Sequence, residues 1–309
     1  MSNPEILPPA IPADLPPPPN TIFRGPNGIR AGWRALTFLA IVGALLTLVS
    51  IIVVLIAHGR LGALSQLTPA GLALSEGSIF LLTAIPALIM SRVEHRKFSQ
   101  YGLPLRHAFQ QDFWIGSLVG FLAISGCLLG IFLFRGFHLT GLAIHGTTVF
   151  TAMAKWGLAF IIVGLAEEFS FRGYLQYTLT TGMGFWPSAV LLSALFGFAH
   201  ASNPGESRTG LLSVFLFGLL FCLFLRRTGN LWWAVGFHAG WDWGQTFFYG
   251  VPDSGIIANN NLFNSNLSGP AWVTGGTVGP EASVFAPITL LVVAVWFTRR
   301  YRENRYQAD

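Results

Sequence analysis

The sequence predicts an all-α fold, a polytopic transmembrane helix bundle, from its low charge, its recurrent apolar stretches and its basic loops. Of the 309 residues, 52% are hydrophobic and only 10% are charged, and the mean hydropathy is +0.58. A soluble globular protein carries about 25% charged residues, because water must wet its surface. This composition excludes an ordinary cytosolic enzyme, a disordered protein and a nucleic-acid-binding protein.

Apolar stretches long enough for the roughly 20 helical residues that cross a bilayer recur along the chain. We expect about eight spans, near residues 35–57, 69–91, 113–134, 151–175, 185–203, 209–225, 230–250 and 285–298. Most of the 18 Lys and Arg residues then fall in the tails, the 92–112 loop and the 226–229 turn. Cytoplasmic loops hold an excess of these residues, so both termini are expected on the inner side, N-in and C-in.

The regions outside the spans differ in composition. Residues 1–29 hold nine of the 18 prolines and predict a flexible cytosolic tail, before a transmembrane bundle over 30–300 and a basic cytosolic tail over 301–309. The 251–284 loop is rich in Asn and Gly, nearly uncharged, and expected to pack over the outer end of the bundle. Cys127 and Cys222 lie inside apolar runs, which argues against a disulfide framework or a cysteine metal cluster.

Three ionisable residues end the fourth predicted span. Glu167, Glu168 and Arg172 follow a long apolar run, and each charge at mid-membrane costs about 2.5–3.5 kcal/mol on insertion scales. Glu168 and Arg172 are i,i+4 neighbours on a helix and can form a structural ion pair. Glu167 points about 100° away from Glu168 and is left without that arginine. A purely structural interpretation therefore fits the pair but not Glu167.

Two further spans carry isolated polar residues. His200 ends the fifth span, and His238 and Asp242 are i,i+4 neighbours on the seventh. Taken singly, these residues are explained by a hydrogen-bonded packing histidine and a local His–Asp bond. Intramembrane ionisable groups normally face the bundle interior and meet there, so we expect these three, together with Glu167, to line one cavity. Glu76, near the outer end of the second span, is expected at the membrane interface.

Such a cavity has more than one chemical interpretation. One Glu, two His and one Asp around a single water make a hydrolytic zinc site or a general-base site, and a proton relay uses the same residue types. Gly173, Gly197, Gly236 and Gly240 lie beside these polar positions, where small residues let helices approach closely. Ordinary glycine-rich packing of membrane helices is the alternative explanation for them.

The three motifs together resemble a known family. Glu167-Glu168-x-x-x-Arg172, Phe196-x-x-x-His200 and His238-x-x-x-Asp242 are similar to the signature of the type II CAAX prenyl endopeptidases. This is the CPBP group of intramembrane metalloproteases, which includes proteins like lysostaphin resistance protein A and bacteriocin-processing proteins. The resemblance covers a CAAX-protease-like core over about 92–298, and the segment Thr274–Ser283 resembles one that is common in bacterial members.

The resemblance implies a role for each matching residue. Glu167 would activate a water, His200 would hold or polarise it, and His238 with Asp242 would stabilise the oxyanion or complete a metal site. The implied metal ligands are Glu167, His200 and His238, with zinc as one option and a metal-free glutamate mechanism as the other. Family members often have Asn where this chain has Asp242, and an ionised Asp cannot donate a hydrogen bond to an oxyanion. Structural support of the site would come from Glu168, Arg172 and Phe196.

The sequence thus predicts an intramembrane endopeptidase, a multi-pass protein of the cell membrane and of bacterial origin. Its expected partners are the lipid bilayer and a membrane-associated peptide or protein substrate, lipidated or bearing a leader. The alternatives are a non-catalytic scaffold or bacteriocin self-immunity protein and, less favoured, a proton-coupled transporter.

Overall fold

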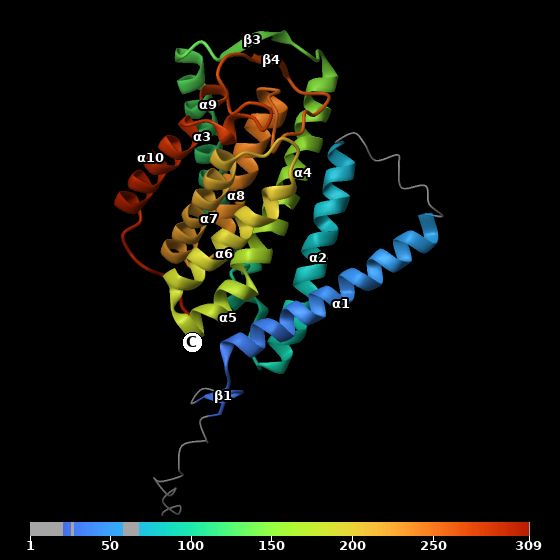
Figure 1. Ribbon diagram of the computed structural model, residues 1–309, viewed down its shortest axis with the longest axis vertical. Helices are drawn as coiled ribbons and strands as arrows, with labels where there is room; N and C mark the ends of the chain where they lie inside the picture. The colour runs from blue at the N-terminus through green and yellow to red at the C-terminus, as the bar shows by residue number, and fades with distance from the viewer. Residues whose placement is uncertain (1–20, 26–27, 58–67, 309) are drawn as a thin grey trace, which may run out of the picture.

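Long helices that run mostly along one axis make up the computed structural model, which describes residues 21–25, 28–57 and 68–308 (Figure 1). Those that form the body of the molecule are α1 (Ala31–Ala57), α2 (Pro69–Val93), α3 (Gln111–Leu133), α4 (Thr147–Arg172), α6 (Phe185–Ala199), α7 (Arg208–Thr228), α8 (Trp232–Asp242) and α10 (Phe285–Arg300). The shorter helical segments are η2 (Phe98–Tyr101), η3 (Leu105–His107), α5 (Tyr174–Met183), η4 (His200–Ser202), the π-helical turn η5 (Trp243–Phe248), α9 (Ala271–Thr274) and η6 (Pro280–Ala282).

The all-α prediction is confirmed, with two small two-stranded antiparallel sheets added at the ends of the bundle. Strand β1 (Arg24–Gly25) pairs with β2 (Gly28–Ile29), and β3 (Phe137–Leu142) pairs with β4 (Phe263–Leu267). In the described part of the chain, six helical segments are long and apolar enough to cross a membrane. The other two of the eight expected spans correspond to α8 continued by η5, and to the 16-residue α10, which are shorter.

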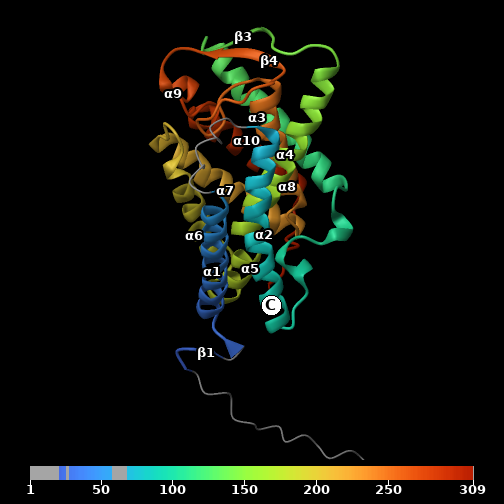
Figure 2. The same ribbon diagram turned by 90° about the vertical axis from the view of Figure 1, so that its right-hand side faces the viewer.

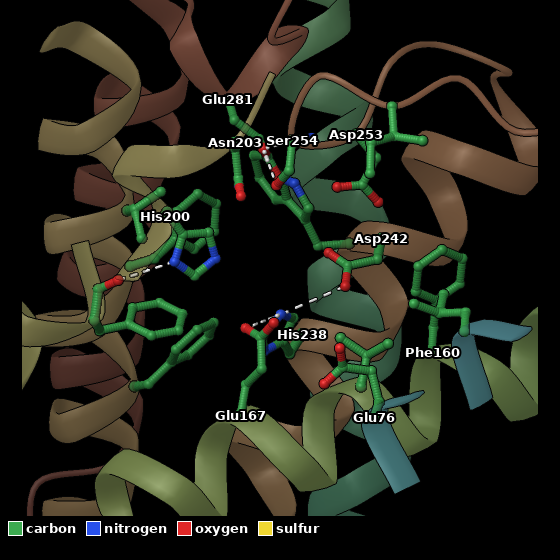
Figure 3. Close-up of a pocket in the computed structure, with 18 residues that line it drawn as sticks. Glu76, Phe160, Glu167, His200, Asn203, His238, Asp242, Asp253, Ser254 and Glu281 are labelled. Atoms are coloured by element: carbon green, nitrogen blue, oxygen red, sulfur yellow. Dashed lines mark hydrogen bonds and ion pairs between the residues drawn. The ribbon is translucent and has the colours of Figure 1, made fainter. Parts of the chain in front are cut away.

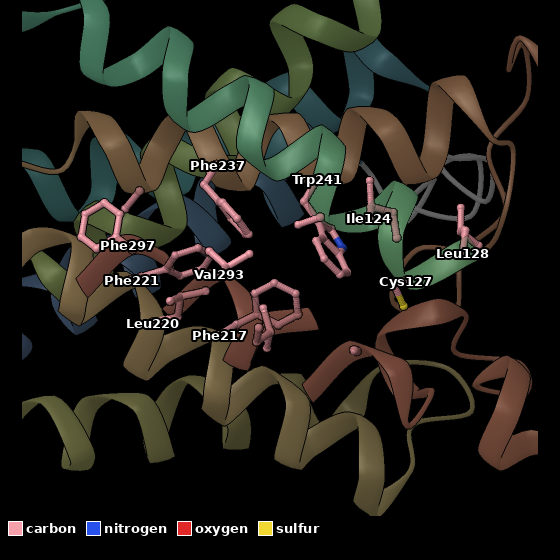
Figure 4. Close-up of a cluster of buried hydrophobic side chains, with 14 of the residues drawn as sticks. Ile124, Cys127, Leu128, Phe217, Leu220, Phe221, Phe237, Trp241, Val293 and Phe297 are labelled. Carbon is pink, nitrogen blue, oxygen red and sulfur yellow. The ribbon is translucent and has the colours of Figure 1, made fainter. Parts of the chain in front are cut away.

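Helix α8 lies at the centre of the bundle, where nearly every one of its side chains is buried. A helix that is apolar all round must be enclosed by others, and α3 packs along it. A Cβ on Gly236 or Gly240 would approach the carbonyl oxygen of Phe113 or Ser117 in α3 to about 2 Å. The expectation that these two glycines permit close helix contact is confirmed. Figure 4 shows the buried hydrophobic cluster that α3, α7, α8 and α10 form together.

Helix α1 is built differently, since only 6% of its most apolar window is buried. It crosses obliquely in front of the bundle and contacts α2 and α5 near its own start (Figure 1). Its exposed Leu, Ile and Val side chains would be unfavourable in water but are suited to acyl chains.

The two ends of the molecule carry different segments (Figure 2). Strands β3 and β4, with α9, cover one end, as expected for the 251–284 loop. The amino-terminal hairpin and the carboxyl terminus lie at the opposite end, where the amides of Arg305 and Tyr306 donate to the carbonyl oxygen of Arg226. Both described ends therefore share one side, and which side faces the cytosol stays a prediction. Residues 1–20 and 26–27 of the predicted tail lie outside the described residues.

Candidate active site

One cavity of about 230 Å³ lies within the bundle, and all four predicted catalytic residues line it (Figure 3). Glu167 comes from α4, His200 from η4 directly after α6, and His238 and Asp242 from α8. The prediction that these side chains share one cavity is confirmed, with His200 in η4, which directly continues α6 within the same candidate span. The role of each residue stays a prediction.

His238 is held between three carboxylates. Its Nδ1 lies 3.0 Å from Oε1 of Glu168, and its Nε2 lies 3.6 Å from Oε2 of Glu167 and 3.4 Å from Oδ2 of Asp242. A carboxylate accepts the hydrogen bond, so Nδ1 is the donor toward Glu168. Glu168 thereby fixes the ring so that Nε2 is the nitrogen nearest to the two cavity carboxylates.

Glu168 also forms the predicted i,i+4 ion pair with Arg172, at 3.6 Å between Oε1 and Nη1. Both side chains are fully buried, and the guanidinium lies over the rings of Phe196 at 4.3 Å and Phe221 at 5.6 Å. Phe196 meets the His200 ring edge to face at 4.7 Å, and Phe221 stacks on His238 at 5.2 Å. Arg172 therefore contacts both aromatic rings that pack against the two histidines.

His200 has one ring nitrogen engaged with the backbone. Its Nδ1 lies 2.9 Å from the carbonyl oxygen of Phe196, one turn earlier in α6. Because a carbonyl can only accept, Nδ1 is the donor, and the neutral ring carries its lone pair on Nε2. That lone pair is suited to accept a hydrogen bond from water.

Further polar residues in the cavity wall were not predicted from the sequence. Glu76 was expected at the membrane interface, near the outer end of its span. Its depth in the membrane stays a prediction, and its side chain lines the cavity from α2. Helix α2 packs along α4, which brings Glu76 to the same space as Glu167. Its Oε2 is buried and has no hydrogen-bond partner among the described residues. The rule that intramembrane carboxylates face the interior would have predicted this position.

The 251–284 loop supplies two more carboxylates, Asp253 and Glu281, to the wall of the cavity. The Thr246 hydroxyl donates to Asp253 Oδ2 at 2.7 Å, and the amide and hydroxyl of Ser254 both donate to Glu281 Oε2 at 3.2 Å. Burial raises the pKa of Asp253 to about 6. Burial, and then the neighbouring Asp253, raise the pKa of Glu281 well above its ordinary value. Nothing in the sequence around Asp253 indicates a functional role. Glu281 lies in the Thr274–Ser283 segment, whose resemblance to bacterial family members could have pointed to it.

The donor atoms that come closest to a metal-ligand arrangement are all oxygens. One carboxylate oxygen each from Asp242, Asp253 and Glu281 lies within 4.8 Å of the others, and these three could hold a cation. All-oxygen sets suit hard cations better than zinc, which favours nitrogen and sulfur. The implied zinc set of Glu167, His200 and His238 does not form such a group among the described residues.

Comparison with protein families identifies the segment that holds these residues. Residues 149–244 match the family model described as type II CAAX prenyl endopeptidase Rce1-like. This segment is similar to the Rce1-like family. The match runs from α4 to η5 and so contains Glu167, His200, His238 and Asp242. It is consistent with the CPBP family, and the Rce1-like family is a family of proteases. The comparison with curated proteins found no match.

The matched region does not contain the whole cavity wall. Glu76 precedes it in the chain, and Asp253 and Glu281 follow it. With its six long apolar helices, the chain is a multi-pass membrane protein. Segments before and after the matched region therefore contribute residues to the wall of the same cavity.

Proposed function

We propose that this protein is an intramembrane endopeptidase that hydrolyses a peptide bond of a membrane-associated substrate with a water activated by Glu167. One observation carries the proposal: Glu167, His200, His238 and Asp242 line one cavity inside a helix bundle, within a domain that resembles proteases. We further propose that the protein resides in the cell membrane of a bacterium, and that its substrate is lipidated or bears a leader.

Glu167 is the best placed general base. Arg172 is paired with Glu168, and no arginine among the described residues forms an ion pair with the Glu167 carboxylate. Its side chain is 24% exposed, whereas that of Glu168 is fully buried, which leaves Glu167 in contact with the water-accessible space of the cavity. A carboxylate in this position can take a proton from water.

The reaction then proceeds in two steps. Glu167 removes one proton from the water while Nε2 of His200 accepts a hydrogen bond from it, and the water oxygen attacks the carbonyl carbon of the scissile bond. The tetrahedral oxyanion is stabilised by His238 in its imidazolium form, in which Nδ1 donates to Glu168 and Nε2 donates to the oxyanion. Glu167 returns the proton to the leaving amine as the C–N bond breaks. Asp242 orients His238 through the 3.4 Å contact with Nε2.

The test compares Glu167→Gln with Glu303→Gln, an equivalent change at a side chain that is 77% exposed near the carboxyl terminus. Each variant is reconstituted in liposomes with a library of membrane-anchored peptides, and cleavage is followed by mass spectrometry. Loss of a positioned general base costs a factor of about 10²–10⁴ in rate. We expect this loss for Glu167→Gln and none for Glu303→Gln, with equal melting temperatures.

Two outcomes contradict the proposal. Full activity of Glu167→Gln would show that Glu167 is not the general base. Unchanged function in cells of all three variants, Glu167→Gln, His200→Ala and His238→Ala, would indicate a non-catalytic scaffold or immunity protein. Metal analysis of the same purified samples tests the zinc expectation separately. Stoichiometric zinc in the wild type that is absent from His200→Ala and His238→Ala would establish the metal mechanism in place of the metal-free one.

A further inference from the structure

A second cavity, of about 610 Å³, lies at the end of the bundle that carries the amino-terminal hairpin. Its walls are the β1–β2 hairpin and the start of α1 on one side and the end of α5 on the other, which Figure 1 shows close together. Three arginines line it, Arg30, Arg34 and Arg96, and none of the described residues that line it is acidic. It shares no residue with the candidate active site.

Two of these arginines share one carboxylate. Nη2 of Arg34 lies 2.5 Å from Oε2 of Glu94, and Nε of Arg96 lies 3.7 Å from the same oxygen. The Tyr174 hydroxyl donates to the other oxygen of Glu94 at 2.5 Å. Glu94 can balance only one of the two guanidinium charges, so this pair leaves the cavity wall with excess positive charge.

The arginines are also held in place by their neighbours. Nη1 of Arg34 lies 3.4 Å from the Thr181 hydroxyl, and Nη1 of Arg96 donates to the Tyr177 hydroxyl at 2.5 Å. The Arg96 side chain stays 26% exposed, against 12% for Arg34. Arg96 thus presents a partly exposed guanidinium in a fixed position, which reduces the entropy lost on binding an anion.

The rim of the cavity is apolar. Ile29 and Met183 line it and are 52% and 46% exposed. Beside them, the rings of Phe23 and Trp33 contact each other with centroids 4.9 Å apart, and both are largely exposed. Tryptophan is enriched at the membrane–water interface, and α1 starts here with a mostly unburied apolar surface. These features predict that the cavity lies at the level of lipid headgroups.

We propose that this cavity binds the phosphate-bearing headgroup of an anionic phospholipid, with an acyl chain against the apolar rim. Guanidinium groups bind phosphate through charge-assisted hydrogen bonds. Basic pockets between transmembrane helices on the cytoplasmic side are suited to anionic headgroups, and the distribution of Lys and Arg predicts that this end is the inner one. Free inorganic phosphate offers the same charge but makes no use of the apolar rim.

The test measures lipid retention by the full chain. Delipidated protein is placed in nanodiscs that contain equal amounts of phosphatidylglycerol and phosphatidylcholine, and the lipids that remain bound after extraction are counted by native mass spectrometry. The variants are Arg96→Gln and Arg30→Gln, and the control is Arg106→Gln. Arg106 is an exposed arginine in the same connection between α2 and α3 as Arg96, and it does not line the cavity.

We expect phosphatidylglycerol to be retained in preference to phosphatidylcholine by the wild type and by Arg106→Gln. Each variant in the cavity should lower that preference about fivefold, which is the effect of one basic residue near an anionic membrane surface. Melting temperatures identify variants that misfold. Should Arg96→Gln fail to fold, Arg30→Gln decides, because that side chain is exposed.

Three results overturn the proposal. The first is that the wild type shows no preference for the anionic lipid. The second is that Arg106→Gln loses this preference as much as the cavity variants do. The third is that millimolar inorganic phosphate displaces the lipid. The last result would identify a free-anion site instead. None of these results depends on peptidase activity, so the proposal stands or fails independently of the one for the active site.

Discussion

The candidate active site has two walls that are built in different ways. On the helical wall, formed by α4 and α8, each charged group lies against an opposite charge or an aromatic ring, as Glu168 does with Arg172 and His238. On the loop wall, Asp253 and Glu281 lie close to Asp242 and are satisfied by hydroxyl and amide donors rather than by cations. The helical wall fixes side-chain positions by burial and pairing, whereas the loop wall concentrates negative charge.

The largest expected effect comes from breaking the helical wall at Arg172. Arg172→Ala leaves Glu168 as a buried carboxylate without its cation, at a cost of about 3–5 kcal/mol in the free energy of unfolding. It also removes the group that contacts Phe196 and Phe221, so activity should fall together with the melting temperature in detergent. An unchanged melting temperature with abolished turnover would instead make Arg172 a catalytic residue.

A smaller effect is expected from Gly218 in α7, which borders the same guanidinium. A Cβ at this position would lie 2.6 Å from Nη2 of Arg172 and 2.8 Å from Cβ of Ser193. Gly218→Ala should therefore destabilise the protein by about 1–3 kcal/mol through overpacking, measured by chemical unfolding in detergent. Gly126→Ala in α3 is the control, because a Cβ there meets nothing within 4 Å. Equal stability of the two variants would show that the helical wall is not tightly packed.

The smallest expected effect concerns the loop wall and is a dependence on pH. The folded protein holds the pKa of Asp253 at about 6, above its ordinary 3.8, so protonated Asp253 is favoured by folding. The contribution of Asp253 to the free energy of unfolding is complete below about pH 4 and is lost as the pH rises to about 6. Because the group is partly exposed, we expect this loss to be about 1–2 kcal/mol.

Asp253→Asn should remove this loss and flatten the dependence of the melting temperature on pH between 4 and 6. The measurement is made in EDTA, so that a bound cation does not reverse the sign. A wild type that becomes more stable over this range, with the variant unchanged, would show that the loop carboxylate is favoured in its ionised form.

Much of the helical wall could be predicted from the sequence. The low charge content and the repeated apolar stretches establish a helix bundle in a membrane, since a buried backbone in lipid must satisfy its own hydrogen bonds. The i,i+4 spacing of Glu168 with Arg172, and of His238 with Asp242, predicts local contacts that the structure contains. The cost of isolated charges in lipid predicts that Glu167, His200 and His238 meet. These inferences succeed because they depend on helical periodicity and on burial.

Only the tertiary structure decided which residues complete the cavity and how the histidines are held. Glu76, Asp253 and Glu281 reach it from segments before and after the motifs, through the packing of α2 on α4 and the path of the 251–284 loop. The same holds for Phe221, whose ring lies between Arg172 and His238 because α7 packs beside α8. Contacts between distant segments depend on the relative positions of whole helices, and no spacing along the chain encodes those positions.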